Sequence, residues 1–219
     1  MDSDTRAGER FSMVERQIAG RGIVNPHVLA AMRQVPRHLF VPPPYDRSAY
    51  EDNPLPIGNG QTISQPYIVA LMTELLNPGP EDRVLEIGAG SGYQAAILAF
   101  LAKEVISIER IPAVAELARS NLKKQGIGNA RVILGDGTTG YPEGAPYDGI
   151  IITAAAPQVP KPLLGQLGNG GRLVAPAGSR DIQELVRITR TGERLEESRH
   201  GGVRFVPLIG RYGWNGDLT

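Results

Sequence analysis

The sequence predicts an α/β domain built on a mostly parallel sheet, and two observations support this fold class. Between residues 81 and 180, short apolar segments alternate with helical patterns, which is typical of repeated strand–helix–strand units. Residues 84–87 and 150–153 are mostly apolar without strict alternation, as expected for strands that are covered on both faces. The chain has 219 residues, which suits one domain of this class.

Helices are expected to precede the sheet. Residues 11–40 look helical, because Asn25 and Pro26 form a typical helix start: Asn caps free backbone N–H groups, and Pro fits the first helical position. A proline-rich connection and a Gly/Asn turn at residues 57–60 then lead to a second helix that begins near Pro66. The buried face of this second helix is predicted to consist of Ile68, Leu71, Met72 and Leu75.

The sheet is expected to contain five strands in its core, over residues 83–87, 104–109, 130–134, 147–153 and 171–176. Helices are predicted between them at residues 92–101, 112–125 and 160–167. After the core, residues 184–190 and 203–208, with a turn at residues 191–193, are expected to form antiparallel strands that close one edge. The sheet is therefore mostly parallel with an antiparallel C-terminal edge.

The domain is predicted to extend over residues 11–214. We divide it into an N-terminal helical region (11–80), a cofactor-binding core (81–180) and the C-terminal antiparallel strands (181–214). The polar ends, residues 1–10 and 215–219, are expected to be disordered or mobile tails.

Charge and composition argue against several classes of partner. Lys plus Arg total 23 and Asp plus Glu total 23, so the chain has no net field that would attract nucleic acid or an anionic membrane. It has no Cys, which excludes disulfides and thiolate metal sites, and no metal is expected. The first ten residues lack an apolar signal region, and the longest apolar segments are too short to cross a bilayer, so the cytoplasm is the expected location.

A glycine-rich turn carries the most chemical information. One buried strand leads into Gly88, Gly90 and Gly92, and Tyr93 then begins a helix. The Gly-x-Gly-x-Gly spacing differs from the dinucleotide fingerprint, and Glu86 stands two residues before the first glycine. A carboxylate at that place would repel a pyrophosphate but suit the amino group and sulfonium of S-adenosylmethionine. The alternative is a turn with a purely structural role.

Two more carboxylates follow the next strands. Glu109 lies nineteen residues beyond Gly90, where a ribose-binding carboxylate is expected, because its two oxygens could accept from both ribose hydroxyls. Asp136, next to Gly137, could accept from the amino group of adenine. The alternatives are a solvated carboxylate at a strand end for Glu109 and an ordinary Asp-Gly turn for Asp136.

Together with these motifs, four segments give the chain a specific resemblance. They are residues 61–66 (Gln-Thr-Ile-Ser-Gln-Pro), 135–140 (Gly-Asp-Gly-Thr-Thr-Gly), 153–157 (Thr-Ala-Ala-Ala-Pro) and 204–208 (Arg-Phe-Val-Pro-Leu). From about Met13 to Gly210 the chain resembles the protein-L-isoaspartate O-methyltransferases. Two positions depart from the pattern of that family: Ala89 replaces a frequent Thr, and Tyr141 replaces a frequent Trp.

The resemblance implies a Rossmann-like class I methyltransferase sheet of seven strands with an added N-terminal helical region. It also implies that Ser64 is the active-site hydroxyl and that residues 62–65, with Thr62, Ile63 and Ser64 as contacts, border the cofactor. Val206 and Leu208 are implied to line the isoaspartyl pocket. For Ser64 itself, the alternative is that it caps the helix beginning near Pro66.

The implied function is methyl transfer from S-adenosylmethionine to the α-carboxylate of L-isoaspartyl residues in damaged proteins and peptides, which starts repair through a succinimide. S-adenosylhomocysteine is the product, and the enzyme is expected to act as a monomer. A carboxylate is already ionised at neutral pH, so the reaction needs alignment and not a general base. The alternatives are a carboxyl methyltransferase for a small molecule or peptide natural product, and a non-catalytic cofactor-binding protein.

Overall fold

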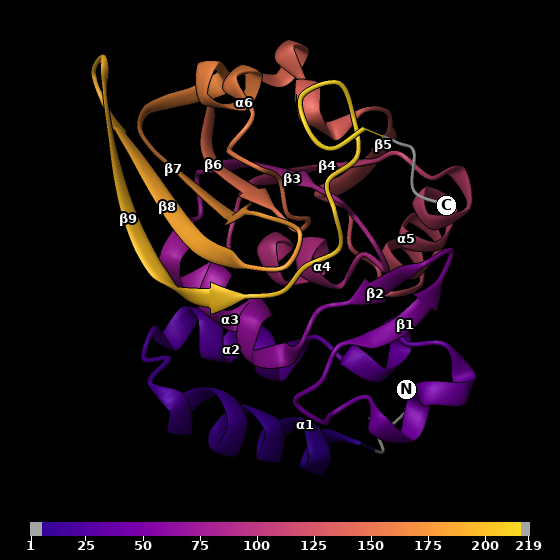
Figure 1. The fold of residues 1–219 in the computed structure, drawn as a ribbon. Coiled ribbons are helices and arrows are strands. Elements are labelled where there is room, and N and C mark those ends of the chain that lie inside the picture. Colours follow the sequence, from indigo (N-terminus) through magenta and orange to yellow (C-terminus); the bar gives the residue numbers. More distant parts are fainter. Residues whose placement is uncertain (1–5, 216–219) are drawn as a thin grey trace.

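One sheet runs through the centre of the molecule, with strands in the order β5-β4-β3-β6-β7-β8-β9 (Figure 1). The computed structural model describes residues 6–215. Five neighbouring strands, from β5 to β7, are parallel, and β8 and β9 add antiparallel pairings at one edge. The strand bounds are β3 Arg83–Ile87, β4 Glu104–Glu109, β5 Ala130–Leu134, β6 Tyr147–Ile152, β7 Leu167–Gly178, β8 Gln183–Thr191 and β9 Arg194–Val203. The predicted fold class is confirmed.

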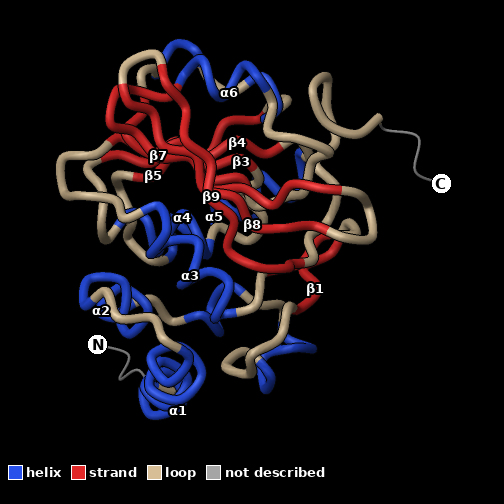
Figure 2. The backbone as a smooth tube through the Cα atoms, turned by 60° about the vertical axis from the view of Figure 1, so that its left-hand side comes forward, coloured by secondary structure: helices blue, strands red, loops and turns tan. Residues whose placement is uncertain are grey.

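Helices cover both faces of this sheet (Figure 2). On one face lie α3 (Pro66–Leu76), α4 (Tyr93–Ala99) and α5 (Pro112–Lys124), and the N-terminal helices pack outside them. The other face is covered by α6 (Lys161–Gln166) and by the segment that follows β9. The side chains of β3 alternate between the cores on the two faces of the sheet. Val84 packs in the core on the side of α3, and Leu85 packs in the core on the side of α6.

The N-terminal region is helical, as predicted, but it is broken into short pieces. It contains α1 (Ala7–Met13), a π-helical turn (Val14–Ile18), a 3₁₀ turn (Ala19–Arg21), α2 (Pro26–Gln34) and two further 3₁₀ turns (Arg37–Phe40 and Pro43–Ser48). The side chain of Asn25 accepts from the N–H groups of His27 and Val28, at 3.0 and 3.3 Å, which confirms the predicted cap of α2. The predicted tail over residues 1–10 is wrong for residues 7–10, which begin α1; residues 1–5 and 216–219 lie outside the described part of the chain.

The predicted buried face of α3 is only partly right. Met72 is buried, but Ile68, Leu71 and Leu75 are half-buried, and the fully packed positions include Val69 and Leu76. The helix lies between the sheet and the N-terminal helices, so it is enclosed on more than one side. A helix that is enclosed in this way shows no single apolar stripe in its sequence.

The C-terminal edge differs from its prediction. Residues 194–203 form β9, whereas residues 204–208, which were expected in a strand, leave the edge after Val203. They cross to the segment after β6, where Ala155 donates to the Val206 carbonyl at 2.8 Å and Leu208 donates to the Ala155 carbonyl at 2.7 Å. Pro207 has no N–H group and cannot continue a regular ladder. This crossing brings Val206 and Leu208 to the centre of the molecule.

A β-hairpin lies where the sequence indicated only a turn. Strands β1 (Leu55–Gly58) and β2 (Gln61–Ile63) pair antiparallel around Asn59 and Gly60, which both have positive φ, 52° and 69°. A two-residue turn with both central residues in this region matches the right-handed twist of a hairpin. The hairpin leads directly into Ser64 and α3.

Candidate active site

The glycine turn after β3 lies where the carboxyl ends of three parallel strands meet. Gly88 has φ 97°, and a Cβ atom added to it would lie 2.5 Å from Oγ1 of Thr153, which follows β6. Gly92 has φ 86°, and a Cβ there would lie 3.2 Å from the Ala118 carbonyl oxygen of α5. Both positions therefore exclude side chains, through backbone conformation and through space.

Two cavities border this turn, and an outer groove lies next to them. The inner cavity is lined by residues 61–64 after the hairpin turn, by residues 88–91, and by Val69, Tyr93, Gln94, Glu109, Thr153, Ala154 and Val206. The side cavity, of about 380 Å³, extends from Glu109 to Gly137 and Leu208. The outer groove, of about 880 Å³, runs from Ser64 past Val206 to the β7–β8 connection. Val206 borders all three, so the cavities are neighbours in the structure.

Glu109 lies at the boundary between the inner and side cavities. Its carboxylate accepts from the Gly90 N–H at 3.2 Å and from the Ile111 N–H at 3.0 Å, one oxygen for each donor. The residue is 6% exposed, and each oxygen keeps a further acceptor position. The carboxylate is thus held rigidly while it can still accept hydrogen bonds from a ligand.

Glu86 has a different environment. It is fully buried and lines none of the three cavities; one carboxyl oxygen accepts from the Ser107 hydroxyl, and within residues 6–215 the other has no hydrogen-bond partner. Burial raises its pKa to about 8, against the hydrogen bond from Ser107, and the charge of Glu109 adds to the increase. The carboxyl is therefore mostly protonated at neutral pH. Because it is neutral and does not line a cavity, the structure does not support the prediction that its negative charge attracts a sulfonium.

Asp136 lies behind the side cavity, which Gly137 lines. Its Oδ1 accepts from the N–H and the hydroxyl of Thr138, at 2.9 and 2.7 Å, and its Oδ2 accepts from the Arg211 N–H at 2.8 Å. Burial opposes ionisation, but these three donors together hold its pKa below the usual range. Asp136 thus anchors the C-terminal segment, and its contact with adenine stays a prediction.

Ser64 borders both the inner cavity and the outer groove. The structure does not support its alternative role as a helix cap, because α3 begins after Gln65, and the N–H of Tyr67 is bound by the Asp52 carboxylate at 3.1 Å. Among the residues that the structure describes, the Ser64 hydroxyl has no hydrogen-bond partner. It is free to donate to a ligand.

The structure brings most of the predicted site residues together. Those that line the cavities are Thr62, Ile63, Ser64, Gly88, Gly90, Tyr93, Glu109, Gly137, Val206 and Leu208. Glu86, Gly92 and Asp136 lie outside the lining and support it from behind. Gln61, Thr153 and Ala154 also line the inner cavity and were not predicted as site residues, although all three lie in the segments that carry the resemblance. Thr153 donates to the carbonyl of Gly88 at 2.6 Å and so fixes the glycine turn.

The environment of Glu86 predicts a specific dependence of stability on pH. In the unfolded chain the Glu86 carboxyl loses its proton near the ordinary pKa of 4.5, whereas in the folded protein it keeps the proton until about pH 8. The contribution of Glu86 to the free energy of unfolding is therefore complete below pH 4.5 and decreases as pH rises from 4.5 to 8. Glu86→Gln cannot ionise. Between pH 5 and pH 8, the free energy of unfolding should therefore fall by about 2 to 4 kcal/mol more in the native protein than in Glu86→Gln. Denaturant unfolding at both values measures this, and identical pH dependence of the two proteins would contradict the buried neutral carboxyl.

The described residues also contain no helix long and apolar enough to cross a membrane. Across residues 6–215, no group of three or more His, Cys, Asp or Glu side chains is arranged to hold a metal ion.

The comparisons with known proteins agree with this geometry. The family model for protein-L-isoaspartate(D-aspartate) O-methyltransferase matches residues 9–213. A protein-L-isoaspartate O-methyltransferase from Methanoregula boonei is 68% identical over 209 residues, covering 95% of this chain and 96% of its own. A solved protein-L-isoaspartate O-methyltransferase is similar with a TM-score of 0.83 and 30% identity, over 94% of this chain and 67% of that one.

A second solved structure, from Plasmodium falciparum, was assigned to the same enzymes and is in complex with S-adenosyl-L-homocysteine. It has a TM-score of 0.79 and 27% identity, over 91% of this chain and 98% of that one. The family match covers the helical region, the sheet and the C-terminal crossing, which together build the three cavities. The chain belongs to the protein-L-isoaspartate(D-aspartate) O-methyltransferase family.

Proposed function

We propose that this chain transfers a methyl group from S-adenosylmethionine to the α-carboxylate of L-isoaspartyl residues in damaged proteins and peptides, so that repair can proceed through a succinimide. One observation carries the proposal: the free hydroxyl of Ser64 stands at the junction of the inner cavity, which holds the glycine turn and Glu109, and the outer groove, which is open to a peptide.

The inner and side cavities fit S-adenosylmethionine. Gly88 and Gly90 line the inner cavity without side chains, so a ligand can approach their backbone. Glu109 offers acceptors for two ribose hydroxyls, and Ile87, Ile108 and Leu208 give the side cavity an apolar lining beyond it for a planar base. Its volume of about 380 Å³ lies within the range of small-molecule sites. Thr62, Ile63 and Tyr93 border the end where the methionine moiety would lie.

When bound, S-adenosylmethionine supplies an electrophilic methyl group, and as the new C–O bond forms and the C–S bond breaks, the carboxylate and sulfonium charges cancel. Ser64 can donate one hydrogen bond to a substrate carboxylate oxygen and leave the other oxygen free to attack. None of the cavity-lining residues within the described range is a His, which suits a reaction that needs no general base. Ile63, Val69 and Val206 contribute apolar walls to the inner cavity, which suit a reaction that is favoured by removal of water.

The outer groove supports a peptide as substrate. Its volume of about 880 Å³ is more than twice that of the side cavity, and its rim is formed by Arg180, Arg204 and the exposed Ile182. Val206 and Pro207 also line it, as does Ser64. These features favour an extended chain over a small carboxylic acid as the acceptor.

The proposal includes action as a monomer in the cytoplasm, without nucleic acid or membrane partners. The equal numbers of acidic and basic residues support a protein substrate over a nucleic acid.

Two peptides that differ only in Asp versus isoAsp test the reaction and its selectivity together. With labelled S-adenosylmethionine, we expect methyl transfer to the isoAsp peptide alone. In isoAsp the α-carboxylate is a short branch and the peptide chain continues through the β-carbon, and the groove must fit both. Equal methylation of both peptides would contradict the repair function and leave a general carboxyl methyltransferase.

Ser64→Ala should lower turnover with the isoAsp peptide by about 10-fold to 1000-fold, because it removes one orienting hydrogen bond. Cofactor affinity, measured by calorimetry, and the melting temperature should stay close to those of the native protein. Ser198→Ala, on the exposed strand β9, is the matched control and should change none of the three. A loss of thermal stability with turnover retained would show that Ser64 has a structural role only.

Glu109→Gln should weaken S-adenosylmethionine binding by about 1 to 3 kcal/mol, because the amide offers one ribose acceptor fewer and no charge. Glu104→Gln changes the same side chain at the other end of β4, away from the cavities, and should bind normally. Calorimetry with both variants and with NAD gives the measurement. Unchanged affinity in Glu109→Gln, or comparable NAD affinity in the native protein, would contradict the cofactor assignment.

A further inference from the structure

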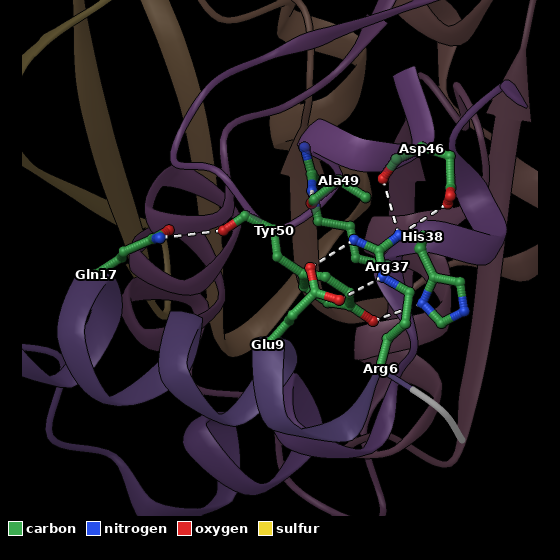
Figure 3. A network of polar contacts seen from close by, with 8 residues as sticks. All are labelled: Arg6, Glu9, Gln17, Arg37, His38, Asp46, Ala49 and Tyr50. Carbon is green, nitrogen blue, oxygen red and sulfur yellow. Dashed lines mark hydrogen bonds and ion pairs between the residues drawn. The ribbon is translucent and has the colours of Figure 1, made fainter. Parts of the chain in front are cut away.

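The segment before the β1–β2 hairpin is tied to the N-terminal helices by their polar side chains (Figure 3). The amide of Gln17 donates to the Tyr50 carbonyl at 3.0 Å, and the guanidinium of Arg37 donates to the Ala49 carbonyl at 2.8 Å. Arg37 also reaches the Asn53 carbonyl at 3.3 Å and is fully buried. Gln17 and Arg37 thus bind backbone carbonyls on both sides of Asp52.

The carboxylate of Asp52 extends from this segment to the active-site loop. It accepts from the side-chain amide of Gln65 at 2.6 Å and from the backbone N–H of Tyr67 at 3.1 Å. It also forms an ion pair with Arg21 at 2.5 Å, and the Arg21 guanidinium lies 3.6 Å from the centre of the Tyr67 ring. One carboxylate therefore joins the N-terminal helices to the two residues on either side of Pro66.

The N-terminus of α3 is capped by a residue that is distant from the helix in the sequence. Gln65 is the N-cap residue but makes no side-chain capping bond, whereas Asp52 binds the N–H of Tyr67, the second residue of the helix. An anionic acceptor is favourable at a helix N-terminus. Because Ser64 directly precedes Gln65, fixing Gln65 and Tyr67 also restrains the backbone position of Ser64.

We propose that Asp52 is a positioning residue for methyl transfer: it holds Gln65 and the first turn of α3 so that Ser64 stands at the junction of the inner cavity and the outer groove. This role rests on the function proposed above for Ser64. Asp52 does not need to touch the reacting atoms, because a displacement of about 1 Å at an aligning group can cost about 100-fold in rate.

Asp82 provides a matched control. Like Asp52, its side chain is 21% exposed, and it accepts from a backbone N–H, that of Gly79 at 2.8 Å, and pairs with an arginine, Arg172 at 3.5 Å. It stands just before β3, at the opposite end of that strand from the glycine turn. Asp82→Ala therefore removes the same kinds of contact without disturbing Ser64.

The kinetic experiment compares Asp52→Ala, Asp52→Asn, Asp82→Ala, Ser64→Ala and the double variant Asp52→Ala/Ser64→Ala with the isoAsp peptide. We expect Asp52→Ala to lower kcat by about 10-fold or more while cofactor affinity changes less than about twofold. Asp52→Asn should recover most of kcat, since its oxygen can still accept from the Tyr67 N–H. In the Ser64→Ala background, Asp52→Ala should lower kcat by less than about twofold further, because both changes act through one hydroxyl.

A kcat in Asp52→Ala equal to that in Asp82→Ala would overturn the proposal. So would a double variant in which the two losses multiply in full, since Asp52 would then act independently of Ser64.

Amide hydrogen exchange provides a readout that needs no turnover. The N–H groups of Ser64, Gln65 and Tyr67 should exchange about 10-fold faster in Asp52→Ala and at the native rate in Asp82→Ala. Unchanged exchange in Asp52→Ala would refute the positioning role even if kcat falls. If the native protein fails to prefer isoAsp, the proposed function fails, while the exchange rates still decide whether Asp52 holds this loop.

Discussion

The close approach of three parallel strands at their carboxyl ends is the constraint on which the rest of the site depends. Gly88 donates to the Ile108 carbonyl at 2.8 Å, and Thr153 donates to the Ile87 carbonyl at 2.9 Å, so the backbones after β3, β4 and β6 are tied together. No side chain fits at Gly88. The result is a backbone cradle with Glu109 beside it, and the opening between these strand ends is what a ligand can occupy.

The two parts of the chain contribute differently to this site. The ends of the sheet strands and their turns form one wall of the inner cavity, and the loop that carries Ser64 forms another. Arg37 and Asp52 of the N-terminal region bind the segments on either side of that loop. The C-terminal crossing completes the enclosure with Val206. The inner cavity and the outer groove thus share part of their lining, including Ser64 and Val206.

This arrangement favours a reaction that depends on alignment of the reacting groups and not on proton transfer. The buried carboxyl of Glu86 has a pKa raised to about 8 by burial, and Glu109 is fixed by two backbone donors. Within residues 6–215, neither carboxyl is hydrogen-bonded to Ser64. A hydroxyl that donates one hydrogen bond is sufficient for an acceptor that is already an anion, so rigid support of that hydroxyl matters more than its own acidity.

The sequence by itself determined the elements whose signals are local. Strands β3, β4 and β5 were predicted with their observed bounds, and the glycine spacing with Glu109 indicated the cofactor site, because strand patterns and strand-end motifs lie within a few residues. Tertiary structure alone decided that β9 forms from charged residues, that residues 204–208 leave the edge, and that Glu86 is buried as a neutral acid. It also decided that Asp52, and not Ser64, caps α3, since that contact joins residues fifteen positions apart through packing that no local pattern encodes.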